Sequence, residues 1–442
     1  MHRLLFFVIF LFFILLTSGC SKIATPDELL EQPALNIEHR SIKDAVDQFL
    51  PEGSSLITIS KNEKVLQDSF SKIDLDSDGI FEFIFFYKEN KSKFIQAILL
   101  QEKGENWHKL CDIPLDAGDI LRYQVEDLNN DMQKEIIIGA YVSNISELSI
   151  FSFQDQQLRK IVQTPYESMD IADMDNDMSF EIAVLFREDD FSESRIRLFN
   201  IENQKSILLD EIIFEEFKEA YYIRIGRIYD DTKAIFVDSY TQIHSGYTDI
   251  FFLEQKKLRS YEEKFNQKLK DKYYLIRSSD VDEDGFCEIG YPYAPPDDLE
   301  IDYEKMNGDY AVSYYKIKKD GSVHFAKQIY YNESIGLIFN VPQNFIYKYD
   351  IKRLDQDTRL ICNYYTPSKE SWPLFEIFLM EKEAAKEDQD ELQLLGETQN
   401  QLVMGRVFDY SKDLEDPEKL NYLEMRTQIL DLSKYIDLSG ID

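Results

Sequence analysis

The chain has 442 residues, of which 44% are hydrophobic and 14% aromatic, so it can bury the cores of two or three domains although 30% of its residues are charged. Lys and Arg number 49 against 83 Asp and Glu, which gives a formal net charge of −34. Such an acidic surface repels phosphate backbones and anionic headgroups, which excludes nucleic acid as an expected partner, and it attracts cations.

The first twenty residues have the pattern of an export signal. A short basic start precedes an unbroken apolar run over 4–16, and small residues at 17–19 lead into Cys20. The run is too short to span a bilayer as a stable helix, but it suits the hydrophobic region of a secretory signal peptide. An ordinary signal peptide or an N-terminal membrane helix with an incidental Cys are the alternatives.

This start resembles a bacterial lipobox, in which signal peptidase cuts before the Cys and the thiol carries diacylglycerol. The resemblance implies that 1–20 are a lipoprotein signal peptide and that lipidated Cys20 anchors an extracytoplasmic protein to the membrane. A diacylglycerol together with an N-terminal acyl chain supplies the multiple-chain anchoring that stable attachment needs. Residues 21–54 are expected to form a tether and one short helix, from Ser41 to Leu50.

Four acidic segments share the pattern D-x-[DN]-x-D-x-x-x-E, and each precedes a strand-like apolar stretch. They begin at residues 74, 127, 173 and 280, so the starts are separated by 53, 46 and 107. The doubled last interval predicts a silent repeat near 227, where Arg227 and Tyr229 replace the first two acids. Five units of about 50 residues, each with three to four strands, are typical of propeller blades.

The units resemble FG-GAP or VCBS-type repeats, the family of the integrin α-subunit propeller and of many bacterial surface proteins. The resemblance covers 55–335 and implies a mainly β fold, a β-propeller of about five to seven blades. Further strand-like stretches and helical character over 381–395 and 420–435 predict a small α+β domain over 336–442. An irregular final blade with a tail helix is the alternative.

Each acidic turn offers the hard oxygen ligands that calcium prefers. Acids at positions 1, 3, 5 and 9 of a tight turn point into one concavity, and the carbonyl at position 7 would join them. The predicted calcium ligands are Asp74, Asp76, Asp78, Ile80 and Glu82; Asp127, Asn129, Asp131, Gln133 and Glu135; Asp173, Asp175, Asp177, Ser179 and Glu181; and Asp280, Asp282, Asp284, Phe286 and Glu288. An EF-hand is excluded because its position 12 would fall in a strand.

The four turns are not equivalent. Gly79 and Gly285 occupy position 6, where a sharp turn favours positive φ, whereas Met132 and Met178 occupy it in the second and third turns. Asn129 also lowers the charge of the second turn. The first and fourth turns are therefore predicted as the strongest sites, followed by the third and the second. The alternative is a metal-free hairpin whose Asp side chains cap backbone amides, and direct binding by the Glu at position 9 is left open.

No sequence motif of a hydrolase nucleophile, phosphate loop, zinc peptidase or Cys–His pair is present, and the four Cys lack the spacing of a disulfide framework or zinc site. The acidic run over 297–304 reads as a solvated insertion or a cation or partner contact. The expected function is a non-enzymatic binding or scaffold module for a protein, peptide or glycan, with structural calcium. The alternative is a polysaccharide lyase or hydrolase on a calcium-binding propeller, because 27 Tyr leave many candidate bases.

Overall fold

The computed structural model describes residues 37–57, 72–265, 276–293 and 309–438, except 105, 144, 155, 188–192, 215–218, 243–244, 333–335, 355–357, 367–369, 383–391 and 398–399. The expected signal peptide, the lipidation site at Cys20 and the acidic run over 297–304 lie outside the described residues. None of the described helices is long and apolar enough to cross a membrane. The chain divides into two compact units, a first of 1–60, 66–74 and 78–116 and a second of 61–65, 75–77 and 117–442.

The first unit contains a helix and a four-stranded antiparallel sheet of order β1-β2-β3-β4. Its elements are α3 (Ile37–Phe49), β1 (Ser54–Leu56), β2 (Glu82–Glu89), β3 (Ile95–Lys103) and β4 (Asn106–Ala117). The predicted helix is present, but it begins at Ile37 rather than Ser41. One apolar cluster joins its buried face to the sheet, through Ile42, Ala45, Val46, Phe83, Phe85 and Trp107.

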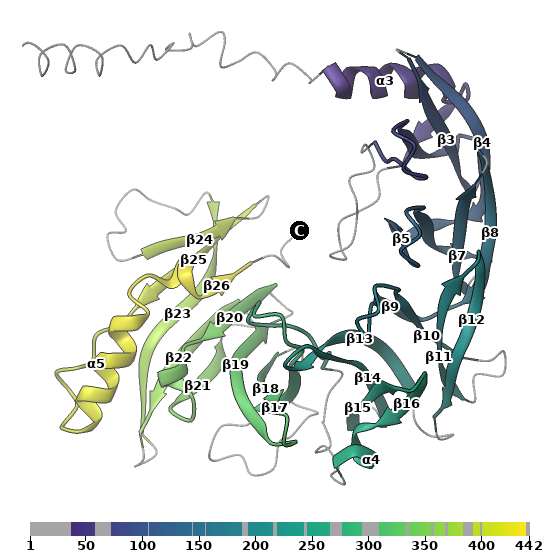
Figure 1. The fold of residues 1–442 in the computed structure, drawn as a ribbon. Helices are drawn as coiled ribbons and strands as arrows, with labels where there is room; N and C mark the ends of the chain where they lie inside the picture. Colours follow the sequence, from purple (N-terminus) through teal and green to yellow (C-terminus); the bar gives the residue numbers. More distant parts are fainter. Residues whose placement is uncertain are drawn as a thin grey trace, which may run out of the picture. The chain divides into compact units, whose positions relative to one another are not determined.

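Three four-stranded antiparallel sheets follow in the second unit (Figure 1). Neighbours in the chain are neighbours in each sheet, because short hairpins connect the strands. The first two sheets contain β5 (Asp119–Glu126), β6 (Glu135–Val142), β7 (Ile145–Gln154) and β8 (Gln157–Pro165), then β9 (Ser168–Ala172), β10 (Glu181–Arg187), β11 (Ser194–Glu202) and β12 (Lys205–Ile213). The third contains β13 (Glu219–Tyr229), β14 (Thr232–Gln242), β15 (Ser245–Glu254) and β16 (Lys257–Ser260), and α4 (Tyr261–Phe265) follows it.

Two five-stranded sheets complete the described part of the second unit. The first has the order β17-β18-β19-β20-β26, with β17 (Ile289–Tyr293), β18 (Asp309–Ile317), β19 (Val323–Asn332), β20 (Leu337–Val341) and β26 (Ile436–Asp437). The other has the order β21-β22-β23-β25-β24, with β21 (Tyr349–Leu354), β22 (Arg359–Tyr365), β23 (Ser371–Glu381), β24 (Leu392–Glu397) and β25 (Gln401–Val407). The helices here are η2 (Gln343–Phe345), α5 (Glu418–Gln428) and η4 (Leu432–Lys434).

Apolar clusters join each sheet of the second unit to the next. Ile137 of β6 shares a cluster with Ile182 of β10, and Leu198 of β11 shares another with Ile235 of β14. A third cluster contains side chains of β14, β15 and β17. The strands after the acidic turns read as continuous apolar runs because both of their faces are covered, and each fully buried aliphatic side chain contributes about 1.5–3 kcal/mol.

The prediction of a mainly β fold is confirmed, and antiparallel four-stranded sheets dominate it. The expected boundary between 335 and 336 falls between β19 and β20, which pair in one sheet, and β26 extends that sheet at Phe339. The last hundred residues therefore share a sheet with the repeat region. The prediction of a helix over 381–395 is wrong at its C-terminal end, where Leu392–Glu397 forms strand β24 and pairs with β25.

Candidate metal centres

Each acidic turn is a hairpin connection with the same register. The residue before position 1 pairs with the Glu at position 9, as Ile73↔Glu82, Glu126↔Glu135, Ala172↔Glu181 and Ser279↔Glu288. The strand that begins at or just after this Glu is β2, β6, β10 or β17. Four copies of the sequence pattern therefore occupy one structural position, and position 12 lies within a strand in each copy.

The Asp residues at positions 1 and 5 accept backbone hydrogen bonds inside every turn. A carboxylate oxygen of position 1 accepts the N–H of position 6 at 2.9 to 3.1 Å, from Gly79, Met132, Met178 and Gly285. A carboxylate oxygen of position 5 accepts the N–H of position 7 at 2.7 to 3.1 Å, from Ile80, Gln133, Ser179 and Phe286. These bonds hold the Asp side chains inside the turn, and each carboxylate retains further lone pairs for a cation.

Two residues of every turn adopt positive φ. Position 6 does so in all four turns, at φ 82° for Gly79, 68° for Met132, 73° for Met178 and 86° for Gly285. Position 4 does so as well, at Ser77, Asn130, Asn176 and Glu283. Gly adopts this region freely, whereas Met and Glu do so at a steric cost of about 1–2 kcal/mol. The predicted positive φ at position 6 is confirmed, and position 4 was missed although its two Asn residues are typical of such a site.

The Glu at position 9 is buried, with an exposed fraction of 2% or less in all four turns. Its Oε2 accepts the backbone N–H of position 2 in three turns, at 3.1 Å from Leu128, 2.7 Å from Met174 and 2.9 Å from Val281. Burial, helped by the neighbouring Asp charges, raises the pKa of Glu135, Glu181 and Glu288 to about 7. Burial therefore favours the protonated form of each of these carboxyl groups more than solvent would.

Carboxylates converge in three of the four turns. In each group, one ligand oxygen from every member lies within 4.8 Å of the others, and the groups are Asp74, Asp76 and Asp78; Asp173, Asp175 and Glu181; and Asp280, Asp282, Asp284 and Glu288. In the second turn, Asn129 donates its amide N–H to Asp131 at 3.0 Å. The backbone carbonyls of Ile80, Gln133, Ser179 and Phe286 remain predicted ligands. The second turn, which we rank last for calcium, has no such converging group among the described residues.

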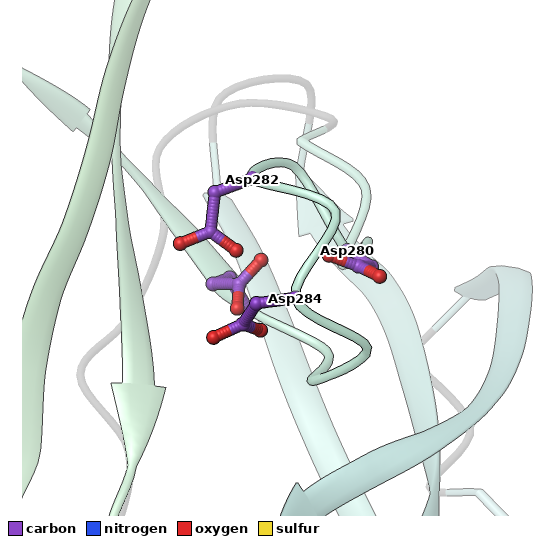
Figure 2. A group of neighbouring side chains, drawn as sticks. Asp280, Asp282 and Asp284 are labelled. Atoms are coloured by element: carbon purple, nitrogen blue, oxygen red, sulfur yellow. The ribbon is translucent and has the colours of Figure 1, made fainter. Parts of the chain in front are cut away.

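The fourth turn already contains a cation. Asp280, Asp282 and Asp284 project from one turn of chain (Figure 2), and Lys316 of β18 inserts its ammonium group among these acids. Lys316 Nζ lies 2.7 Å from Asp282 Oδ2 and 3.7 Å from Glu288 Oε1, and it also bonds Asp284. These ion pairs hold the pKa of Lys316 above its ordinary value despite partial burial. No local sequence pattern predicts this contact, because Lys316 lies on a strand that is distant from the turn in the sequence.

The silent repeat near 227 keeps its strands and shortens its turn. Arg227 of β13 pairs with Lys233 of β14, six residues later, whereas the paired residues that flank each acidic turn are nine apart. The Arg227 guanidinium donates to the carbonyls of Asp284 and Gly285 at 3.0 and 3.1 Å and lies 4.4 Å from the ring of Phe286. The silent repeat therefore supplies a second cationic side chain to the fourth turn.

The third turn has converging carboxylates, and its described cationic neighbour bonds other atoms of the turn. Among the residues that the structure describes, no Lys or Arg forms an ion pair with Asp173, Asp175 or Glu181. Lys233 reaches this turn, but it bonds the backbone carbonyl of Asp173 and the side-chain oxygen of Asn176. The third turn is therefore a stronger candidate than its Met at position 6 suggested, and the fourth is a weaker one.

No family model and no curated protein matches this chain. It resembles the solved structure of the exotype rhamnogalacturonan lyase YesX at 10% identity and a TM-score of 0.28, over 68% of this chain and 69% of that one. It resembles a protein from Lactobacillus plantarum at 8% identity and a TM-score of 0.28, over 66% of this chain and 81% of that one. Likenesses at this level assign neither a family nor a function.

Proposed function

We propose that this chain is a membrane-anchored extracytoplasmic lipoprotein whose repeated sheets form a β-propeller of about five to seven blades. Calcium in the acidic turns stabilises the propeller, which serves as a binding or scaffold module for a protein, peptide or glycan. Consecutive antiparallel sheets that share apolar clusters support the propeller. The lipobox-like sequence that ends at Cys20 supports the anchor.

The observation that carries the calcium proposal is the third turn. Asp173, Asp175 and Glu181 bring ligand oxygens within 4.8 Å of one another. No described Lys or Arg forms an ion pair with these carboxylates, since Lys233 bonds a backbone carbonyl and an amide oxygen of the turn. Two unit charges at such a distance repel by about 3–4 kcal/mol at an effective dielectric constant of about 20. Protonation of Glu181 or binding of a divalent cation relieves this repulsion. Calcium suits the site because it takes six to eight oxygen ligands with flexible geometry.

Thermal unfolding of the mature chain, measured with calcium, with magnesium and with chelator, tests the proposal. Ligand that binds only the folded state raises its stability by RT ln(1 + [L]/Kd), so millimolar calcium should raise the unfolding midpoint. Magnesium should raise it less, because it requires near-ideal octahedral geometry and dehydrates reluctantly. Equal midpoints in calcium and chelator would show that the turns are hairpins held by their own hydrogen bonds.

A further inference from the structure

The fourth acidic turn differs from the others in the strand residue beside its Glu. On the neighbouring strand, Gln101 pairs with Glu82 and Ser152 pairs with Glu135. In the third repeat, Ile182 pairs with Phe199, so Asn200 lies opposite the Glu at position 9. In the fourth repeat, Ile289 pairs with Tyr315, so Lys316 lies opposite that Glu. The side chain opposite the Glu at position 9 is therefore neutral in three repeats and cationic in the fourth.

Lys316 is placed where a metal ion would bind the fourth turn. Its Nζ contacts Asp282 at 2.7 Å and also bonds Asp284, which supply positions 3 and 5 of the ligand pattern. Glu288 is fully buried, and among the described residues its Oε1 accepts no hydrogen bond and lies 3.7 Å from Lys316 Nζ. An ammonium donates three N–H groups to acceptors and matches this set of oxygens.

Calcium and Lys316 cannot share these oxygens. Calcium needs six to eight oxygens at about 2.3–2.6 Å, so it would require the carboxylates of Asp282 and Asp284 that Lys316 now holds. The Arg227 guanidinium adds a second positive charge on the carbonyls of Asp284 and Gly285. Binding of a divalent ion would therefore meet repulsion from two cations and would break two ion pairs.

We infer that Lys316 is an internal counter-ion that keeps calcium out of the fourth turn, so that this turn is fixed by the chain itself while other turns depend on the metal. The inference rests on the proposed calcium function, since it divides that function among the turns. It also implies that one residue decides the metal content: a neutral side chain at 316 converts the fourth turn into a calcium site.

The test counts bound calcium on the full-length chain in detergent, by equilibrium dialysis and by isothermal titration calorimetry. The wild type is compared with Lys316→Gln, Asp280→Asn and the double variant. Lys316→Gln should bind one calcium ion more than the wild type, the double variant should lose that ion, and Asp280→Asn alone should leave the count unchanged. Lys319→Gln is the matched control, since Lys319 is exposed and pairs with Asp230 outside the turn; it should leave the count unchanged.

Two results overturn the inference. A lower count in Asp280→Asn than in the wild type means that the fourth turn holds calcium beside Lys316, and the proposed calcium function then survives. An unchanged count in Lys316→Gln means that the lysine does not govern binding. The calcium count of Asp280→Asn can be compared with that of the wild type even if Lys316→Gln folds poorly. A wild type without bound calcium, together with one ion in Lys316→Gln, supports the exclusion of calcium by Lys316 and overturns the proposed calcium binding by the other turns.

Discussion

Glu181 connects the end of the third acidic turn to its beginning, because its Oε2 accepts a 2.7 Å hydrogen bond from the backbone N–H of Met174. The second and fourth turns repeat this bond at Leu128 and Val281. An oxygen of Glu181 also lies within 4.8 Å of carboxylate oxygens of Asp173 and Asp175. The Glu at position 9 therefore fixes the turn through the backbone and borders the proposed cation site at the same time.

Asp175→Asn should reduce the stabilisation by calcium more than Asp131→Asn does. Asp175 belongs to a converging group without a basic partner among the described residues, whereas Asp131 already accepts the amide N–H of Asn129. At a calcium concentration of 100 times Kd, one site contributes about 2.7 kcal/mol to the free energy of unfolding. Differential scanning calorimetry with and without calcium measures the two losses, and equal losses would contradict the ranking of the turns.

In chelator, the buried Glu135 should make the protein less stable as pH rises. Its folded-state pKa of about 7 lies above the ordinary value, so the folded state binds more protons than the unfolded state between about pH 4.5 and 7. The free energy of unfolding then falls as pH rises through this window, by on the order of 3 kcal/mol for this group. Urea unfolding at pH 5.5 and 7.5 checks the sign.

Glu135→Gln removes this titration and should flatten the pH dependence. The amide keeps an oxygen that can accept the N–H of Leu128, so the turn retains its hydrogen bond. The control is Glu202→Gln, which changes an exposed glutamate at the end of β11. If Glu135→Gln and Glu202→Gln show the same pH profile as the wild type, burial of Glu135 does not govern the dependence.

Met178→Gly should stabilise the protein slightly. Met178 has φ 73° and is 64% exposed, so its side chain loses little buried area when it is removed. The relief of left-handed strain, about 1–2 kcal/mol, exceeds the entropy that Gly adds to the unfolded chain, about 0.5–1 kcal/mol. Thermal unfolding should show a small rise for Met178→Gly and none for Met178→Ala. A lower midpoint for the Gly variant would show that the Met side chain contributes contacts to the turn.

The local sequence was sufficient to predict the acidic turns but not the side chains that contact them from other strands. Acids at fixed spacing predicted four turns, each followed by a strand, and the doubled interval predicted the silent repeat at Arg227, because both features depend on nearby residues alone. Lys316 could not be found in this way. It reaches the fourth turn through the pairing of β17 with β18, and that register depends on the whole sheet.

The C-terminal part of the chain shows that local composition can predict the wrong secondary structure. The segment around Leu392–Glu397 follows a charged stretch whose composition favours a helix, yet it pairs with β25 as a strand. This segment is a strand because helix propensity is a weak preference that tertiary contacts override. The helix predicted over 420–435 is present only as far as Gln428, in α5, where Tyr422 and Met425 are both buried in the same core.

Cys20→Ser should release the protein from the membrane fraction of the cells that produce it. The thiol of Cys20 is the predicted site of the diacylglycerol, and a Ser hydroxyl does not accept this modification in a lipobox. Metabolic labelling with radioactive palmitate should mark the wild type and not the variant. Cys111→Ser is the control, since Cys111 is a free cysteine within the described sheets. Labelled Cys20→Ser protein would contradict the lipoprotein proposal.

Arg227→Met should loosen the fourth turn without unfolding the sheets. The guanidinium donates two hydrogen bonds to the carbonyls of Asp284 and Gly285 and lies over the ring of Phe286. Each hydrogen bond contributes about 0.5–1.5 kcal/mol, and the cation–ring contact about 0.5–1 kcal/mol at an exposed site. Hydrogen exchange of the amides over 280–288 should therefore become about ten-fold faster or more, while exchange in β14 stays unchanged. Arg227→Lys should be intermediate, because a lysine keeps the charge and loses the fork of donors. Unchanged exchange over 280–288 in Arg227→Met would mean that the turn is held by its own Asp side chains, and the silent repeat would then have no part in fixing it.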